Sequence, residues 1–549
     1  MSEGSTATKV RTAQKNLFDA AILVSNLIKS SLGPRGMDKM IVDFKKEIAI
    51  TNDGATILGD LDMNHPAAQA MVEIAKTVDY EVGDGTTSTV VLAGSLLKKA
   101  QDLIDKKVHP TIIIDGYKKG ADKALRILET IAIKVDPTDR NWLIKLALTS
   151  MASKLVSIES PFLASIAVDA LLTIARKSKG DPKIDVDHIK IEKRPGGSIS
   201  DSRLVKGIVL DKPVWVGMPK KLTPARIAIV TKAIEIKKPV DPRSVRININ
   251  KPEEMKMYLE RESKIFKNIV DKFAIAGANV VICQYGMDEL VLDYFSKAGI
   301  LGVRHVKLSD LEMLAKATGA KIISTSREVT ANDLGYAKLV EERKVEIEKY
   351  LFFEGCKNPK SVTIFLRGGT QNVIEEAERS IHDALFVVKD VMVKPQILAG
   401  AGAPEMEIAT QLKKWAQTFT GKEQLAIKAY AEAIEVIPET LAENAGMNSI
   451  DAIIELRAKH SKPNHKAYGV NVQKRKIEDA RKFNVYEPLA VKEQVISAAM
   501  EAATMLLRIN DVLMSSKPQT QKLPERAGAY EYGKADEYSV RDGYGGIEK

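Results

Sequence analysis

The sequence predicts a multi-domain α+β protein in which two helical chain ends flank an α/β middle. Its 549 residues exceed what one hydrophobic core usually organises, so two or three domains are expected. Apolar residues recur at helical spacing near the beginning and again from Glu405 onward. Between Ala225 and Leu366, short β-rich runs such as "ANVVICQ" alternate with helical ones such as "MDELVLDYFSKAG". If the two helical ends pack together, the middle is an insertion in a discontinuous domain.

The N-terminal part is expected to be helical, with one β-hairpin. Apolar residues at helical spacing predict a long helix from Thr12 to Leu32, which "GPRG" then ends. The runs "KMIVDF" and "EIAIT" flank a charged turn at Lys45 and Lys46, which is typical of a hairpin. Further helices are predicted from Pro66, directly after the motif "GDGTT", and from Gly116 to Ile133.

The composition of the chain changes after about Asp181, where Pro and Gly become clustered. Clusters of Pro and Gly such as "KRPGGS" and "EIKKPVDPRS" mark turns and domain boundaries. The segment "IKKPVDPRSVRININKPEEMKMYLERESKIF" begins as a loop and becomes a charged helix with few apolar residues, which can project from the body. The end, from Ser515, is rich in Gly, Tyr, Lys and Glu without periodicity, so a disordered tail is predicted.

Composition and targeting signals predict a cytoplasmic protein. Hydrophobic residues make up 45% of the chain and charged residues 28%. The longest apolar runs are broken by polar residues well short of the roughly 20 needed to span a bilayer, so no membrane contact is expected. The beginning, "MSEGSTATKVRTAQKN", lacks the apolar core of a secretory signal.

Charge and cysteine usage argue against nucleic-acid and metal-binding classes. The net charge is +10, but the basic residues are spread among Asp and Glu, and no nucleic-acid-binding signature is present. No nucleic-acid partner is therefore expected. Cys283 and Cys356 lack CxxC spacing and the His residues form no HxxxH pair, so neither a disulfide framework nor a structural metal is predicted.

An Asp-Gly pair followed by Thr occurs twice, as "NDGAT" at Asp53 and as "GDGTT" at Asp84. The structural interpretation is a turn whose hydroxyl residues cap the next helix. In the second copy, glycines on both sides of Asp84 let backbone N–H groups approach an anion, and the helix adds its positive end. Asp84 is then explained as a magnesium ligand. Because GxxxxGK[ST] is absent, a Walker P-loop is excluded, and both interpretations stay open.

Two further glycine turns, "SLGPRGMDKM" and "LAGAGAPEME", fit the same pocket, although helix capping also explains them. With the two Asp-Gly motifs they make the chain resemble a group II chaperonin subunit of the archaeal thermosome kind. The match runs from about Thr12 to Met514 in the order and spacing of that family. The other motifs that carry it are "HPAAQAMVEIAK", "GANVVICQYGMDELV", "LAKATGAKI", "LRGGTQNVIEEAERSIHDAL" and "EPLAVKEQVISAAMEAATMLLRINDVL".

The resemblance implies an ATP-dependent molecular chaperone, which hydrolyses ATP to fold non-native proteins. Its subunits form a double ring of eight or nine per ring with other members of the family, closed by a built-in lid. It also implies three domains. A mostly helical equatorial ATPase domain is expected at 1–146 and 402–549, and an intermediate hinge domain at 147–214 and 367–401. The α/β apical domain is expected at 215–366, with a helical lid protrusion at about 239–266. The tail at 515–549 is expected to be disordered.

The resemblance also implies ATP and Mg²⁺ as cofactors, with Asp84 as the magnesium ligand. Asp53 matches a carboxylate near the γ-phosphate, and Asp383 matches the one that orients the attacking water. From the residues alone, Asp383 is an ordinary carboxylate of an amphipathic helix. The implied nucleotide-binding residues are Leu32, Gly33, Pro34, Asp84, Gly85, Thr86, Thr87, Ser88, Lys154, Gly402, Asn444, Ala445, Gly446 and Glu487. Among them, Lys154 matches the lysine that senses the γ-phosphate, and the last five match positions that line the nucleoside end of the site.

Several positions depart from the family pattern. Ala401 stands in "GAGA" where the family has "GGGA", Ser153 replaces a Gly, and Asn448 replaces a common Asp. These changes suggest a divergent paralogue that works in a mixed ring. The alternative function is therefore a structural or regulatory subunit of a hetero-oligomeric chaperonin with weak ATPase activity.

Overall fold

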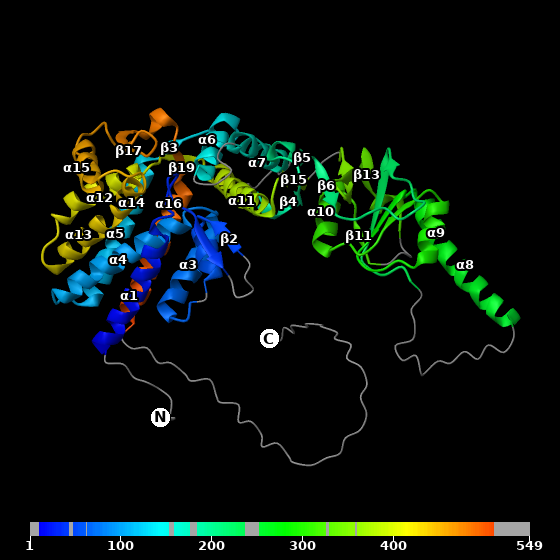
Figure 1. Ribbon diagram of the computed structural model, residues 1–549, viewed down its shortest axis with the longest axis horizontal. Helices are drawn as coiled ribbons and strands as arrows, with labels where there is room; N and C mark the ends of the chain where they lie inside the picture. Colours follow the sequence, from blue (N-terminus) through cyan, green and yellow to red (C-terminus); the bar gives the residue numbers. More distant parts are fainter. Residues whose placement is uncertain are drawn as a thin grey trace, which may run out of the picture.

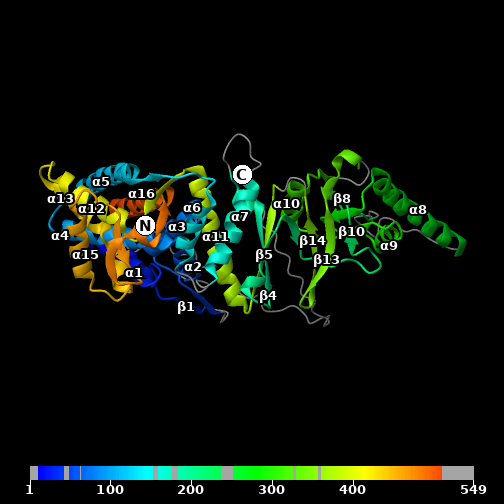
Figure 2. The same cartoon turned by 90° about the horizontal axis from the view of Figure 1, so that it is seen from above.

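The computed structural model describes residues 10–42, 48–61, 63–152, 159–175, 184–235, 252–324, 329–356 and 360–509. Three bodies lie in a row: a helical body built from both ends of the described chain, a middle body, and an α/β body that ends in the helix α8 (Figure 1). The same order is seen from above (Figure 2). The predicted mixture of helices and strands in several bodies is confirmed. No described helix is both long and apolar enough to cross a bilayer.

The helical body has one core to which both chain ends contribute. Leu17, Val90, Tyr430 and Ala499 belong to the same buried cluster, although they come from widely separated parts of the sequence. The middle of the chain is therefore inserted between two segments that share a core. The helices of this body are α1 (Val10–Lys29), α2 (Gly54–Asp60), α3 (Pro66–Val82), α4 (Thr86–Asp105), α5 (Pro110–Ile131), α12 (Ala403–Ala416), α13 (Lys422–Ile434), α14 (Val436–Asn444), α15 (Ser449–His460) and α16 (Leu489–Arg508).

Small sheets attach to this body. The predicted hairpin is confirmed as β1 (Lys39–Val42) and β2 (Ile48–Thr51), which pair antiparallel. Its turn residues, Lys45 and Lys46, lie outside the described residues. The remaining pieces are β3 (Ile133–Lys134), β16 (Gln396–Ala399) and β19 (Tyr486–Pro488) in one sheet, β17 (Tyr468–Asn471) and β18 (Lys476–Asp479) in a hairpin, and η4 (Ala480–Phe483).

Two helix boundaries differ from the sequence-based expectation. The helix expected from Gly116 begins at Pro110, because His109 is its N-cap and its ring accepts a hydrogen bond from the Thr111 N–H at 3.3 Å. The first helix ends at Lys29 and not at Leu32. The chain turns there through Gly33, whose φ is +83°.

The middle body packs three helices on a small sheet. Its core joins Leu146, Leu171, Ile364 and Leu385. In the sheet, β15 lies between β4, which is parallel to it, and β5, which is antiparallel. The elements are α6 (Arg140–Met151), α7 (Ser160–Ala175), α11 (Gln371–Val393), β4 (Ile189–Pro195), β5 (Arg203–Val205), β15 (Val362–Gly368), η1 (Val186–His188) and η2 (Ile199–Asp201).

The α/β body contains a sheet in the order β10-β9-β8-β11, all parallel, with β12 antiparallel on β8, and a second, antiparallel sheet in the order β6-β14-β13-β7. Its elements are β6 (Gly207–Leu210), β7 (Lys221–Leu222), β8 (Ala225–Val230), α8 (Pro252–Ala276), β9 (Val280–Cys283), α9 (Glu289–Lys297), β10 (Leu301–Val303), α10 (Leu308–Thr318), β11 (Ile322–Ile323), η3 (Ala331–Asp333), β12 (Gly335–Ala337), β13 (Leu339–Val345) and β14 (Glu348–Glu354).

The charged helix predicted in this region is α8, which extends away from the rest of its body (Figure 1). Only its C-terminal part packs on the core, through side chains such as Phe266 and Phe273. Met257, in the outer part, is 70% exposed. The first part of the expected protrusion, 239–251, and the expected tail, 515–549, lie outside the described residues.

Candidate functional site

A cavity of about 700 Å³ opens in the helical body, beside the N-terminus of α4. Residues expected at a nucleotide site line it from five stretches of the helical body, and α11 of the middle body contributes one more. The expected residues that line the cavity are Leu32, Gly33, Pro34, Asp53, Asp84, Gly85, Thr86, Thr87, Ser88, Asp383, Gly402 and Glu487.

The loop between α3 and α4 carries Asp84 between two glycines that the backbone requires. Gly83 (φ +65°) and Gly85 (φ +84°) both adopt the left-handed conformation. A Cβ at Gly83 would lie 2.4 Å from Cβ of Phe386, and one at Gly85 would lie 2.7 Å from Cγ2 of Val495. The loop therefore packs tightly between α11 and α16, and glycine at both positions permits that approach.

The helix α4 begins without a side-chain cap. Its N-cap is Gly85, and the first helical residues are Thr86 and Thr87. The expectation that hydroxyl groups cap this helix is wrong, because those residues already lie in its first turn. The Thr89 hydroxyl donates to the Gly85 carbonyl at 3.0 Å instead. The N-terminal end of α4 thus meets the cavity with its partial positive charge uncompensated by a cap, which suits an anion.

The two Asp-Gly motifs lie against each other. Asp53 is the N-cap of α2, and its Oδ2 accepts from the backbone N–H of Thr56 at 2.8 Å and from the Thr56 hydroxyl at 2.7 Å. The capping interpretation therefore holds for Asp53, which also lines the cavity. A Cβ at Gly54 would lie 2.6 Å from Oγ1 of Thr87, so the starts of α2 and α4 are in close contact.

Asp383 reaches the cavity from the middle body. It lies on α11, and its side chain is 14% exposed, whereas that of the neighbouring His382 is 44% exposed. The His382 Nδ1 lies 4.0 Å from the Asp383 Oδ1. A carboxylate that is remote in sequence from both Asp-Gly motifs is thus brought to the same cavity.

Glu487 lines the cavity next to a buried ion pair. Lys492 of α16 lies between the carboxylates of Glu405, at 2.6 Å, and Glu487. Burial opposes the charge on Lys492, but the two carboxylates outweigh it and raise the pKa of that ammonium. Burial in turn raises the pKa of Glu487, which Lys492 counteracts.

Three expected residues do not line the cavity, and one cannot be placed. Asn444, Ala445 and Gly446 lie at the C-terminal end of α14, outside the cavity wall. Asn444 still supports the wall, because its Nδ2 donates to the carbonyl oxygens of Leu32 at 2.8 Å and Lys29 at 3.1 Å. The expected γ-phosphate sensor Lys154, with Ser153, lies outside the described residues.

Sequence reasoning missed several residues of the wall. The strand β17 contributes Asn471, whose Nδ2 donates to the Glu478 Oε2 at 2.8 Å. The signal for Asn471 is only a polar residue in the short run "YGVNVQ", which also suits an edge strand. The other lining residues that were not expected include Arg35, Asn52, Thr149, Ser150, Gln473 and Lys492.

Ala401, which departs from the family pattern, lies in the cavity wall in a strained conformation. Its φ is +61°, in the left-handed region that disfavours a Cβ. Its carbonyl oxygen accepts from the Val470 N–H at 2.9 Å, which holds the turn against β17. The alanine is therefore kept in this conformation by its neighbours.

The carboxylates of the cavity fit a magnesium ion that is shared with phosphate. Among the described residues, no group of three or more His, Cys, Asp or Glu side chains could hold a metal ion by itself. Magnesium commonly binds through one or two carboxylates and completes its shell with phosphate oxygens and water. Asp84, whose Oδ1 accepts from the Gly85 N–H at 2.6 Å, stands beside the uncapped end of α4 where a phosphate fits.

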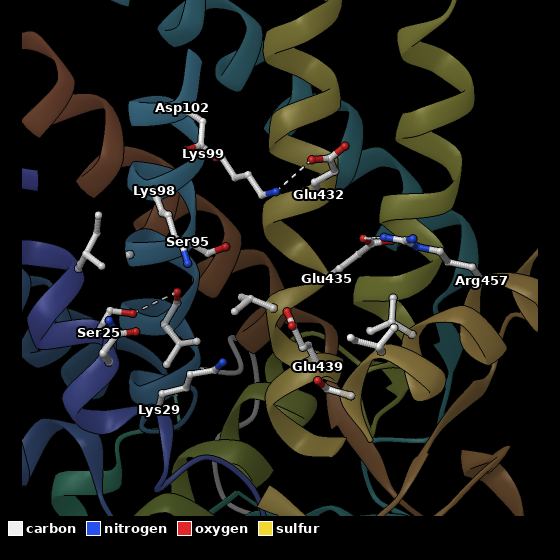
Figure 3. Close-up of a pocket in the computed structure, with 18 of the residues that line it drawn as sticks. Ser25, Lys29, Ser95, Lys98, Lys99, Asp102, Glu432, Glu435, Glu439 and Arg457 are labelled. Carbon is white, nitrogen blue, oxygen red and sulfur yellow. Dashed lines mark hydrogen bonds and ion pairs between the residues drawn. The ribbon is translucent and has the colours of Figure 1, made fainter. Parts of the chain in front are cut away.

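A second cavity, of about 510 Å³, lies between α1, α4 and the helices α13 to α15 (Figure 3). Several of its charged side chains already pair with one another. The Lys99 Nζ lies 3.1 Å from Oε2 of Glu432, and the Arg457 Nε donates to Oε1 of Glu435 at 2.9 Å. This cavity lacks a glycine loop at a helix N-terminus, so the first cavity is the better anion site.

Comparison with known protein sequences identifies the family of this chain. Residues 24–517 match the model of the TCP-1/cpn60 chaperonin family. The chain is 48% identical over 530 residues to a thermosome subunit of Pyrococcus horikoshii and 48% identical over 526 residues to thermosome subunit alpha of Archaeoglobus fulgidus. It is 47% identical over 538 residues to thermosome subunit alpha of Sulfolobus acidocaldarius, and each match covers 96% of both chains. The chain belongs to the TCP-1/cpn60 chaperonin family.

Proposed function

We propose that this group II chaperonin subunit is an ATP-hydrolysing molecular chaperone that folds non-native proteins in a double ring. The observation that carries the proposal is the cavity at the uncapped N-terminus of α4, where Asp53, Asp84 and Asp383 come together from three separate segments. Phosphates suit a helix N-terminus of this kind. Such a constellation has no evident purpose in a purely structural subunit.

Each carboxylate is assigned one role. Asp84 would hold the magnesium ion, which offsets the negative charge of the phosphates. Asp53 would stand near the γ-phosphate, and Asp383 would orient the attacking water. Because Asp383 is carried by α11 of the middle body, movement of that body relative to the helical body would assemble or disassemble the site.

The three bodies are assigned to the domains expected from the family. The helical body would be the equatorial ATPase domain, the middle body the intermediate hinge domain, and the α/β body the apical domain with α8 in its lid protrusion. Archaeoglobus fulgidus has thermosome subunits named alpha and beta, and this chain is 48% identical to both. This supports a ring that contains more than one kind of subunit.

The test is Asp84→Ala, with Asp105→Ala as the matched control. Asp84 lies just before α4, whereas Asp105 is the last residue of that helix and is exposed. We expect Asp84→Ala to abolish magnesium-dependent ATP hydrolysis while the subunit stays folded, and Asp105→Ala to turn over ATP like the wild type. Unaltered turnover in Asp84→Ala would overturn the assignment.

The second candidate is a structural or regulatory subunit with weak ATPase activity. The observation in favour of this second function is the strained conformation of Ala401 in the cavity wall. The similarity to thermosome subunits over nearly the whole chain does not favour this alternative. If the chain alone forms homogeneous closed rings with full ATPase activity, the idea of a specialised paralogue fails.

A further inference from the structure

We propose that Lys492 is a positioning residue of the nucleotide site, which holds the Glu487 carboxylate in place at the nucleoside end of the cavity by tying it to Glu405. The inference rests on the proposed function, since it assumes that the cavity binds a nucleotide. The position is set by three elements that meet there: α16, β19 and α12.

The geometry is that of a buried bridge. The Lys492 Nζ lies 2.6 Å from Oε1 of Glu405 and also contacts Oε2 of Glu487. The side chains of Lys492 and Glu405 are each 7% exposed, and that of Glu487 is 23% exposed. Glu487 is thus the most exposed member at the cavity, Lys492 lines the cavity wall beside it, and Glu405 anchors both from behind.

The Glu487 carboxylate has little freedom to move elsewhere. A Cβ at Gly400, the residue that follows the strand β16, would lie only 2.5 Å from Oε1 of Glu487, so the backbone at the end of this strand closes one side. In the sheet, Glu487 pairs with Leu398 of the same strand. With Lys492 on Oε2 and the Gly400 backbone beside Oε1, the orientation of this carboxylate is fixed before any ligand binds.

Electrostatics make the lysine necessary for that orientation. Asp84 and Glu405 are negative neighbours that disfavour a further carboxylate at Glu487. Removing the ammonium would leave the buried Glu405 carboxylate and the half-buried Glu487 carboxylate without their shared cation, a far less favourable arrangement than the bridged one. The Glu487 side chain would then turn away or lose its charge, and a ribose hydroxyl would lose the carboxylate oxygen to which it donates.

The role of Lys492 differs from that of a generally stabilising ion pair in one measurable respect. A residue that acts only through Glu487 affects the nucleoside end of the ligand and not the phosphate end at α4. Magnesium tripolyphosphate lacks the nucleoside and therefore probes the phosphate end alone. Comparing its affinity with that of ATP separates local positioning from a general loss of structure.

The experiment measures the Kd of ATP and of magnesium tripolyphosphate for the wild type, Lys492→Met, Glu487→Gln and the double variant. We expect Lys492→Met to weaken ATP binding roughly tenfold or more, the scale of one charge-assisted hydrogen bond, with tripolyphosphate binding unchanged. Because Lys492 acts through Glu487, adding Lys492→Met to Glu487→Gln should cause little further loss. Additive losses, or equal losses for both ligands, would overturn the inference.

The matched control is Lys413→Met, which removes a lysine from the same body. Lys413 pairs with Glu435 at 2.7 Å, away from the nucleotide cavity, and Glu435 keeps Arg457 as a partner. We expect unchanged affinity for both ligands in this variant. If Lys492→Met does not fold, Glu405→Gln replaces it: weaker ATP binding with unchanged tripolyphosphate binding supports the inference, and unchanged ATP binding overturns it. A wild-type chain that binds neither ligand contradicts the proposed function itself.

Discussion

His460 Nδ1 lies 2.8 Å from Oε2 of Glu407, and this buried pair joins α15 to α12. The other ring nitrogen, Nε2, lies 2.8 Å from the carbonyl oxygen of Tyr468. Both ring nitrogens are therefore within hydrogen-bond distance of an oxygen, one on α12 and one on β17. Tyr468 begins β17, whose residue Asn471 lines the nucleotide cavity. The pair therefore anchors one wall of the site from behind.

Glu407→Gln should destabilise the protein at neutral pH but not in acid. Burial raises the pKa of Glu407, but the hydrogen bond from His460 outweighs it and holds that pKa below its usual value of 4.5. A carboxylate whose pKa is lower in the folded protein than in the unfolded chain stabilises the fold at a pH above its unfolded-state pKa. This stabilisation is lost as the pH falls through its folded-state pKa. We expect a loss of about 1–3 kcal/mol at pH 7, shrinking toward pH 3, in denaturant unfolding.

The control for this prediction is Glu443→Gln. Glu443 pairs with Lys29 at the surface, where its side chain is 40% exposed. Surface ion pairs contribute little, so the change should stay within about 0.5 kcal/mol at both pH values. A difference between Glu407→Gln and wild type that does not depend on pH would contradict the assigned cause.

Gly402→Ala should cost far more stability than Gly319→Ala, although both glycines adopt the left-handed conformation with a φ of +79°. At Gly402 a Cβ would lie 2.8 Å from Cβ of Pro438, whereas at Gly319 no atom lies within 4 Å. The strain of φ alone costs about 1–2 kcal/mol, and the clash adds to it. Thermal unfolding and ATP binding measure both effects; equal losses in the two variants would show that the contact with Pro438 is unimportant.

The sequence predicted the elements around the site better than the site's inner contacts. Periodicity and turn residues were sufficient for α3, the hairpin β1-β2 and the two Asp-Gly turns, because these depend on local chemistry. The cap at α4 was predicted wrongly, since the helix begins at Thr86 itself and a shift of one residue changes which groups can cap. Lys492 was not found at all. In an amphipathic helix a lysine is ordinarily solvated, and only the arrival of Glu405 and Glu487 from other segments makes it a buried cation.

Asp390→Asn should stabilise the protein at high pH. Asp390 is buried on α11, and its Oδ2 has no hydrogen-bond partner among the described residues. Burial, with the negative charge of Asp84 nearby and Lys389 opposing, raises the pKa of Asp390 to about 7. In the unfolded chain the carboxyl of Asp390 has its ordinary pKa of 3.8, whereas in the folded protein its pKa is about 7. The folded state is therefore favoured by the protonated carboxyl below pH 3.8, and this contribution to stability is lost as the pH rises through about 7.

The asparagine variant cannot ionise, so it should avoid that loss. We expect its advantage over the wild type to be absent near pH 4 and to grow to no more than about 4 kcal/mol above pH 8, measured by denaturant unfolding. An advantage that is the same at both pH values would indicate that the effect comes from packing and not from ionisation of Asp390.

Asp383→Ala decides between an active ATPase and a silent structural site. If Asp383 orients the attacking water, its removal should lower ATP turnover by about 100-fold or more, while the Kd of ATP changes by less than about threefold, because the phosphates are held by other groups. Glu375→Ala is the control, since Glu375 lies on the same helix, accepts from the Gln371 side chain at 2.7 Å and does not line the cavity. Single-turnover hydrolysis and equilibrium binding measure the two quantities separately. Equal turnover in wild type and Asp383→Ala would mean that the site was already silent, and the subunit would then serve the ring through its structure alone.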